Sequence, residues 1–250
     1  MEDTSYFYRI AHGPWTRLRV HMNDVPFYRR DPQEYAITFT DGANHLLVPG
    51  ENALTLEILE APPHVTVIVE ITIDNNHESP VLRIDWPMME EAVPEARALP
   101  FTITARFTAR GTSYRPAYLD APPSHFWPEG TPEQHEVVRD FHAVMARGDT
   151  SGFVEAVGLK SEEYLRAYGG DPTCGKEAAR EEAAEAFAKG VEVRPLRMDD
   201  LVFEQRADGR VAYVTRRDGG KAVEAVAGDG QRFATDLWLT RHNGAWRIFR

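Results

Sequence analysis

Five residues in the C-terminal half of the chain could together form a site for acid–base chemistry. In the strand-like run RFATDLWLT, Asp236 and Trp238 fall on one face, because side chains alternate along a strand. Tyr213 lies in a second such run, RVAYVTR, and Tyr164 and Tyr168, one helical turn apart, could close the mouth of a pocket. An aspartate base with a phenol to stabilise an oxyanion could remove a proton next to a carbonyl group.

The same five residues also have an interpretation without chemistry. Asp236 could point to solvent on the convex face of a sheet, with the tyrosines as ordinary packing residues. The sequence does not decide which face of the sheet is concave. The catalytic residues therefore stay unassigned, and the five residues are a candidate pocket.

The segment GDPTCGK, from Gly170 to Lys176, matches the first part of a phosphate-binding loop. That loop requires a serine or threonine after the lysine to hold magnesium, whereas Glu177 occupies the position here. We therefore interpret the segment as a glycine-rich turn between two helices. Cys174 lies just before the second helix, but no histidine is close in sequence to activate it, so an incidental loop cysteine is favoured.

The segment HEVVR is one histidine short of the helical zinc motif of metalloproteases. Arg139 stands four residues after His135, where that motif needs a second imidazole, and a guanidinium does not ligate zinc. His135 and His142 share a helix face, but two ligands do not make a site. We expect no metal and no cofactor.

Three aromatic residues of the N-terminal half, Trp15, Tyr28 and Trp86, could line a sugar-binding surface. Stacking on a sugar requires a flat ring that is exposed. Aromatic side chains between two sheets are more often buried, so the sequence favours a packing role for them.

These residues have to be positioned by two different kinds of secondary structure. Up to about residue 115 the runs ALTLEILE, VTVIVEITI and FTITARF alternate apolar and polar residues with a period of two, which is typical of half-buried strands. Asp-Gly, Pro-Gly and Asn-Asn turns separate them. The pattern predicts an all-β sandwich over 1–115.

Beyond these strands the pattern changes. A stretch with five prolines predicts a stiff connector over 116–130, and its aromatic residues suggest that it packs on one domain. From Thr131, a capping box, helical apolar spacing and the run KEAAREEAAEAFAKG predict helices, followed by several strands joined by Asp-Gly and Asn-Gly turns. The sequence therefore predicts an α+β domain over 131–250, with helices packed on an antiparallel sheet.

Two resemblances accompany this division. The helix followed by ARGDTSGFVE, and the final hairpin LWLTRHNGAWRIFR, resemble the nuclear transport factor-like cone of ketosteroid isomerases and SnoaL-like proteins. That resemblance implies an apolar cavity between the helices and the concave face of the sheet. More weakly, VPGENALTLEI and NDVPFY resemble jelly-roll sandwiches of the galactose-binding kind. A shared fold does not by itself specify a function.

Composition narrows the function further. The 250 residues carry a formal net charge of −11, which argues against nucleic acid as a partner and favours a basic protein partner. One cysteine excludes an intrachain disulfide, no apolar run is long enough to span a membrane, and the acidic start MEDTSYFYRI lacks a signal-peptide core. We expect a soluble cytoplasmic protein without a membrane partner.

Two functional hypotheses remain open. The first is a non-catalytic binding or interaction protein, such as a bacterial immunity or accessory protein. The alternative is a small-molecule-binding protein, or an isomerase- or dehydratase-like enzyme, that holds a small apolar ligand in the C-terminal cone.

Overall fold

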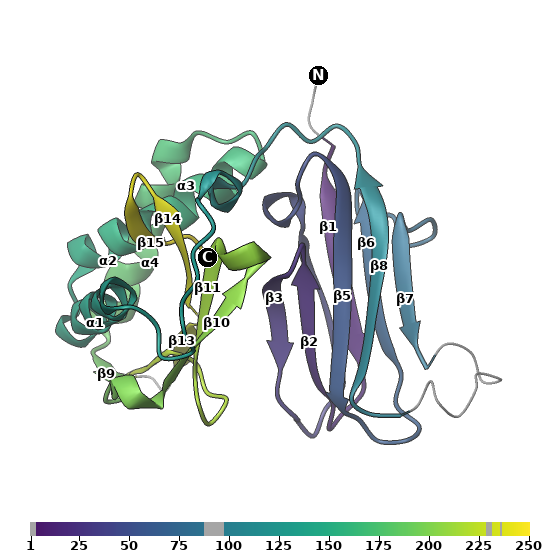
Figure 1. Ribbon diagram of the computed structural model, residues 1–250, viewed down its shortest axis with the longest axis horizontal. Coiled ribbons are helices and arrows are strands. Elements are labelled where there is room, and N and C mark those ends of the chain that lie inside the picture. The colour runs from purple at the N-terminus through teal and green to yellow at the C-terminus, as the bar shows by residue number, and fades with distance from the viewer. Residues whose placement is uncertain (1–3, 88–97, 229–231, 236) are drawn as a thin grey trace. The chain divides into compact units, whose positions relative to one another are not determined.

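The computed structural model describes residues 4–87, 98–228, 232–235 and 237–250. Within these ranges the chain forms four antiparallel sheets and four α-helices (Figure 1). The chain divides into two compact units, Met1–Arg115 and Pro116–Arg250. No helix in the described ranges combines the length and the apolar character that crossing a membrane requires.

The described part of the N-terminal unit contains two four-stranded sheets and the short 3-10 helix η1 (Asn44–Leu46). One sheet has the order β4-β1-β6-β7 and the other the order β3-β2-β5-β8. The strands are β1 (Tyr6–His12), β2 (Arg17–Met22), β3 (Val25–Arg30), β4 (Ile37–Gly42), β5 (Gly50–Glu60), β6 (Val67–Ile73), β7 (Leu82–Trp86) and β8 (Phe101–Ala109). The predicted strand character of this half of the chain is confirmed.

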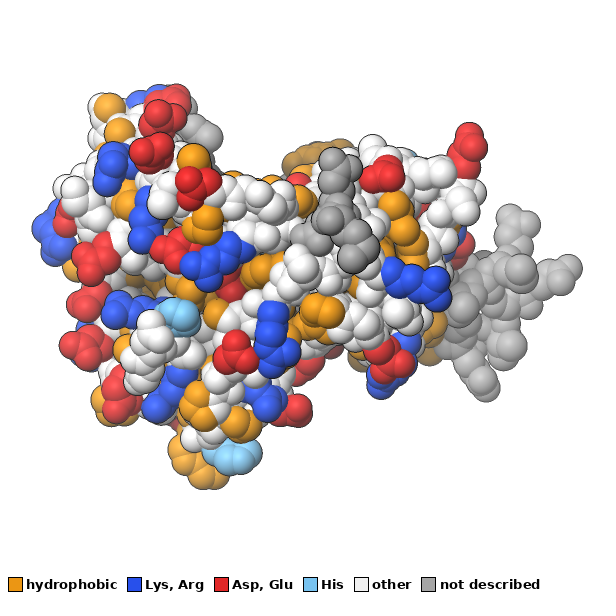
Figure 2. Space-filling view, turned by 90° about the horizontal axis from the view of Figure 1, so that it is seen from above, with side chains coloured by type: hydrophobic (Ala, Val, Ile, Leu, Met, Phe, Trp, Pro, Cys, Tyr) orange, Lys and Arg blue, Asp and Glu red, His pale blue; other side chains and the backbone are white. Residues whose placement is uncertain are grey.

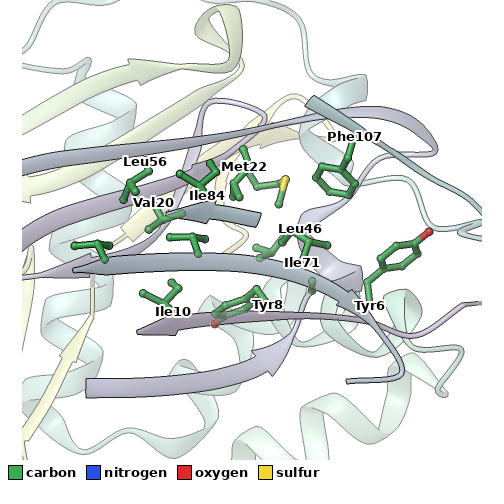
Figure 3. Close-up of a cluster of buried hydrophobic side chains, with 14 of the residues drawn as sticks. Tyr6, Tyr8, Ile10, Val20, Met22, Leu46, Leu56, Ile71, Ile84 and Phe107 are labelled. Carbon is green, nitrogen blue, oxygen red and sulfur yellow. The ribbon is translucent and has the colours of Figure 1, made fainter. Parts of the chain in front are cut away.

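One hydrophobic cluster joins the inner faces of these two sheets (Figure 3). Val20 and Leu56 project into it from one sheet, and Ile10 and Ile71 from the other, all of them fully buried. Burying an aliphatic side chain of this size stabilises a fold by about 1.5–3 kcal/mol. The alternation in the sequence therefore corresponds to one inner and one outer face on each sheet.

The C-terminal unit begins with helices and ends with strands. The described helices are η3 (Ala117–Asp120), α1 (Pro132–Arg147), α2 (Thr150–Ala156), α3 (Gly158–Ala167) and α4 (Pro172–Ala188), with the short η4 (Met198–Asp200) and η5 (Ala207–Gly209) between strands. The strands are β9 (Val191–Val193), β10 (Leu201–Arg206), β11 (Val211–Arg216), β12 (Val223–Ala227), β13 (Arg232–Thr235), β14 (Leu237–His242) and β15 (Ala245–Ile248). They form two sheets, β10-β11-β14-β15 and β13-β12-β9.

Local sequence signals fix where α1 starts and ends and where α2 starts. Thr131 and Gln134 form the capping box, since the Thr131 amide donates to the Gln134 side chain at 2.8 Å and the Gln134 amide donates to the Thr131 hydroxyl at 3.3 Å. Gly148 ends α1 with a φ of 61°, a left-handed conformation that glycine adopts at little cost. Asp149 then caps α2 by accepting from the Gly152 amide at 2.9 Å.

The run RFATDLWLT is not one strand. Its first part is β13, which pairs with β12, and its second part is β14, which pairs with β11 and β15 in the other sheet. Asp236, the predicted base, lies outside the described residues. The alternation that placed Asp236 and Trp238 on one face therefore does not run through the segment as a single strand.

The proline-rich stretch packs on the C-terminal unit. Tyr118 is 2% exposed, and the ring of Phe126 meets that of Trp246 edge-on with 5.9 Å between centroids. Trp127, by contrast, is 79% exposed. The whole stretch belongs to the unit Pro116–Arg250.

Candidate functional site

The structure describes four of the five predicted site residues and brings them together as two pairs. Tyr164 and Tyr168 lie one turn apart on α3 with ring centroids 5.0 Å apart, and Tyr164 is 44% exposed. Tyr213 and Trp238 are opposite each other on β11 and β14, with centroids 5.3 Å apart and an interplanar angle of 31°. Tyr213 is almost fully buried.

The second pair does not lie on the face of the sheet that packs on α1. Ala212 and Val214, the neighbours of Tyr213, join the hydrophobic cluster that contains Val138 and Phe141 of α1. Because side chains alternate along a strand, Tyr213 points to the opposite face. The helix side, where the cone resemblance implies a cavity, is occupied here by packed side chains. The predicted pocket thus stays a prediction, without support from this geometry.

A hollow of about 420 Å³ lies elsewhere in the unit, where α2, α3, the start of α4 and the β14–β15 hairpin meet. We call it the helix–hairpin pocket. Its lining residues are Ser151, Val154, Glu155, Ala156, Gly158, Leu159, Glu162, Lys176, His242 and Arg247. None of the four predicted site residues that the structure describes is among them.

Two structural devices position the polar side chains of this pocket. The Asn243-Gly244 turn, with φ values of 52° and 80°, folds β15 back on β14 and thereby brings His242 and Arg247 to the same hairpin. The helices α2 and α3 share Val157 as a junction, so Glu155 and Glu162 approach the pocket from either side of it. The sequence signals these turns, but not the cavity between them.

The charges of the pocket are only partly paired. Lys176 Nζ lies 2.7 Å from Glu162 Oε1, and Glu162 also accepts from Arg166 at 3.4 Å. The side chains of Glu155, His242 and Arg247 form no hydrogen bond or ion pair with another described residue. The pocket therefore has a carboxylate (Glu155), a guanidinium (Arg247) and an imidazole (His242) without side-chain partners, at positions that are exposed or half-exposed to solvent.

The segment GDPTCGK forms the start of α4 and not a phosphate loop. Asp171 caps the helix by accepting from the Thr173 amide at 2.9 Å, and this hydrogen bond holds the pKa of Asp171 below its usual value. Cys174 is exposed in the first turn. The segment still contributes Lys176 to the pocket.

Gly175 has a packing role. A β-carbon at this position would lie 2.8 Å from the carbonyl oxygen of Ser161, so the glycine allows α4 to pass close to α3. This close passage brings the neighbouring Lys176 into contact with Glu162 of α3.

Replacing Gly175 with alanine is expected to destabilise the C-terminal unit by about 1 kcal/mol. Alanine gains about 1 kcal/mol in helix propensity, but forcing a methyl group into a packed contact costs about 1–3 kcal/mol. Urea denaturation of the full chain, with hydrogen exchange of α4 amides, measures the change. Ala178→Gly, at an exposed position of the same helix, reports the propensity effect alone. A stabilised Gly175→Ala protein would contradict the packing role.

The structure also places the other predicted motifs. His142 Nε2 lies 3.0 Å from the carbonyl oxygen of Arg194, and the ring of His135 packs on Phe203 with centroids 5.2 Å apart. In the described ranges no three His, Cys, Asp or Glu side chains are grouped so as to hold a metal ion. Of the predicted sugar-binding aromatics, Trp86 is buried, Tyr28 is half-buried and Trp15 is 52% exposed.

Comparison with protein-family models, with curated proteins and with solved structures found no match to this chain. The resemblances to the nuclear transport factor-like cone and to galactose-binding-like sandwiches therefore stay predictions.

Proposed function

We propose that this chain is a non-catalytic binding protein that holds a segment of a partner protein in the helix–hairpin pocket. In this proposal residues 1–115 are a β-sandwich domain and residues 131–250 a cone-like α+β domain. An immunity or accessory role would be one form of such a function. The observation that carries the proposal is an open pocket whose unpaired groups have both signs of charge.

The charges indicate what the partner segment should carry. Arg247 has donors for a carboxylate, and Glu155 has acceptors for a basic side chain. Binding at such a site replaces water around these groups with complementary charges, which contributes specificity and speeds association. The face shown in Figure 2 carries acidic and basic side chains interspersed among the described residues.

The geometry of the pocket favours binding over chemistry. Ser151 and His242 both line it, but no hydrogen bond joins them in the described structure. A serine nucleophile needs a base in hydrogen-bonding contact to activate it. Lys176, the other group of catalytic type, is paired with Glu162.

The proposal can be tested by using the full chain as bait in an extract of its native host. The bait is expected to capture a specific partner saturably, and Arg247→Glu is expected to lose it. Arg180→Glu makes the same change of charge at an exposed position of α4 that does not line the pocket, and serves as the matched control.

The captured partner, once purified, allows a quantitative measurement. Titration calorimetry is expected to show Kd about tenfold higher for Arg247→Glu, which corresponds to about 1.4 kcal/mol, and little change for Arg180→Glu. Equal affinity of the wild type and Arg247→Glu for the partner would refute the pocket as the binding site. The lack of any saturable partner would refute the proposed function.

A further inference from the structure

The two sheets of the N-terminal unit do not close completely at the edge where β3 and β4 lie. Both are edge strands of their sheets. Phe39 of β4 is opposite Ile10 of β1, which is fully buried, so both side chains point to the inner side. Nevertheless Phe39 is 40% exposed, and its ring stacks on Tyr28 with centroids 6.2 Å apart and an angle of 24°. Inward-facing aromatic surface is therefore accessible at this edge.

An arginine shares this inner edge. Arg30 of β3 is opposite the fully buried Leu18, so its side chain also starts toward the inner side. Its guanidinium lies 5.4 Å from the ring centroid of Tyr35, which is 58% exposed in the β3–β4 connection. We use the name edge cluster for the five residues His12, Tyr28, Arg30, Tyr35 and Phe39.

The guanidinium of Arg30 has donors without acceptors. Its Nε and Nη2 atoms are enclosed, yet neither has a hydrogen-bond partner among the described residues. Asp31, the next residue along the chain, pairs instead with Arg17 at 3.9 Å and Arg29 at 3.5 Å. Leaving an enclosed donor unsatisfied is costly, and more so when the donor is charged.

The other polar groups of the edge cluster satisfy each other. His12 Nδ1 lies 2.9 Å from the carbonyl oxygen of Gly13, which can only accept, so Nδ1 donates. His12 Nε2 can then accept from the Tyr28 hydroxyl at 3.2 Å. Burial lowers the pKa of His12 and raises that of Tyr28, so both are neutral near pH 7. Arg30 is left as the cation of the cluster.

We infer that the edge cluster is a binding site for an organic carboxylate carried on a ring. The planar guanidinium presents paired N–H groups that match the two oxygens of a carboxylate. The exposed rings of Tyr35 and Phe39 offer flat faces on which a sugar ring or an aromatic ring can pack. Because Nε and Nη2 of Arg30 are enclosed, the exposed Tyr35 ring beside the guanidinium has to move for a ligand to reach them. A ligand of this kind would then supply the acceptors that Arg30 lacks.

This inference lies outside the proposed function, because it concerns the other unit. Loss of carboxylate binding would leave the helix–hairpin pocket unaffected, and variants of the pocket would leave carboxylate binding unaffected. The two proposals can therefore fail separately.

The test is titration of the full chain with galacturonate and benzoate, each against a neutral analogue, galactose and benzyl alcohol respectively. At least one acid is expected to bind saturably and about tenfold or more tightly than its analogue. Preference for galacturonate would identify a sugar acid as the ligand class, and preference for benzoate an aromatic acid. Binding of neither acid would overturn the inference.

Variants assign the binding to the cluster. Arg30→Met is expected to reduce the affinity for the acid about tenfold or more, whereas Arg106→Met, at an exposed residue of β8, is expected to leave it unchanged. Tyr35→Ala removes an exposed ring and is expected to weaken binding several-fold even if Arg30→Met does not fold. Unchanged binding in a folded Arg30→Met protein, or in Tyr35→Ala, would overturn the site.

Discussion

Replacing Arg9 and Arg83 together with methionine is expected to lower the free energy of unfolding of the N-terminal unit by about 3–5 kcal/mol. Both arginines contact Glu70, which is fully buried on β6. Arg9 Nη1 lies 3.2 Å from Glu70 Oε2, Arg83 Nη1 contacts Oε1, and His77 Nδ1 lies 3.3 Å from Oε2. Without the two guanidinium groups, a buried carboxylate would lose most of its compensating charge.

A rescue and a control make this expectation specific. Adding Glu70→Leu to the double variant is expected to recover most of the loss, because replacing a whole buried ion cluster with apolar groups is often neutral. Arg106→Met breaks an ion pair with Glu51 in which both side chains are about two-thirds exposed, and is expected to cost at most about 1 kcal/mol.

Urea denaturation followed by hydrogen exchange of β1 and β6 amides measures these effects in the intact chain. If the double variant is as stable as Arg106→Met, the burial of the Glu70 carboxylate does not depend on its two arginines.

Replacing Gly130 with alanine is expected to destabilise the C-terminal unit by about 2–5 kcal/mol. Its φ is 78°, and a β-carbon there would lie 2.7 Å from Cδ2 of Phe203, which is 2% exposed. The left-handed conformation costs a non-glycine residue about 1–2 kcal/mol, and pushing a packed ring aside costs about 1–3 kcal/mol more. Hydrogen exchange of β10 amides and the thermal unfolding midpoint report the loss.

Gly190 provides the matched control for this variant. Its φ is 75°, nearly the same, but a β-carbon there would meet no atom within 4 Å. Gly190→Ala should therefore show only the backbone cost of about 1–2 kcal/mol. Equal destabilisation by the two substitutions would mean that the contact with Phe203 contributes nothing.

The burial of Glu70 is not what the alternation of the sequence predicts. In VTVIVEITI the alternation puts Glu70 on the polar face with Thr66 and Thr72, yet Glu70 and Thr72 are both fully buried. Glu70 is contacted by Arg83 of the next strand and by Arg9, which lies 61 residues away in sequence. A period of two distinguishes the faces of a strand, but not what covers the second face.

The candidate site shows the same limit. Lys176 and the Asn243-Gly244 turn stand out in the sequence, but the pocket also needs Glu155, Glu162 and Arg247, which carry no motif. Tyr213 and Trp238 have residue types that suggest chemistry, and their rings pack against each other on the face away from α1, so their role as site residues stays a prediction.

The sequence by itself determined the strand character of the first half, the capping box at Thr131, the left-handed end of α1 at Gly148 and the Asn-Gly hairpin, because these depend on neighbouring residues and backbone sterics. Only the tertiary structure decided that RFATDLWLT divides between two sheets, that Glu70 is buried among arginines, and that Arg30 lacks acceptors. Each of these depends on which distant segments come into contact, and that is set by packing of the whole unit.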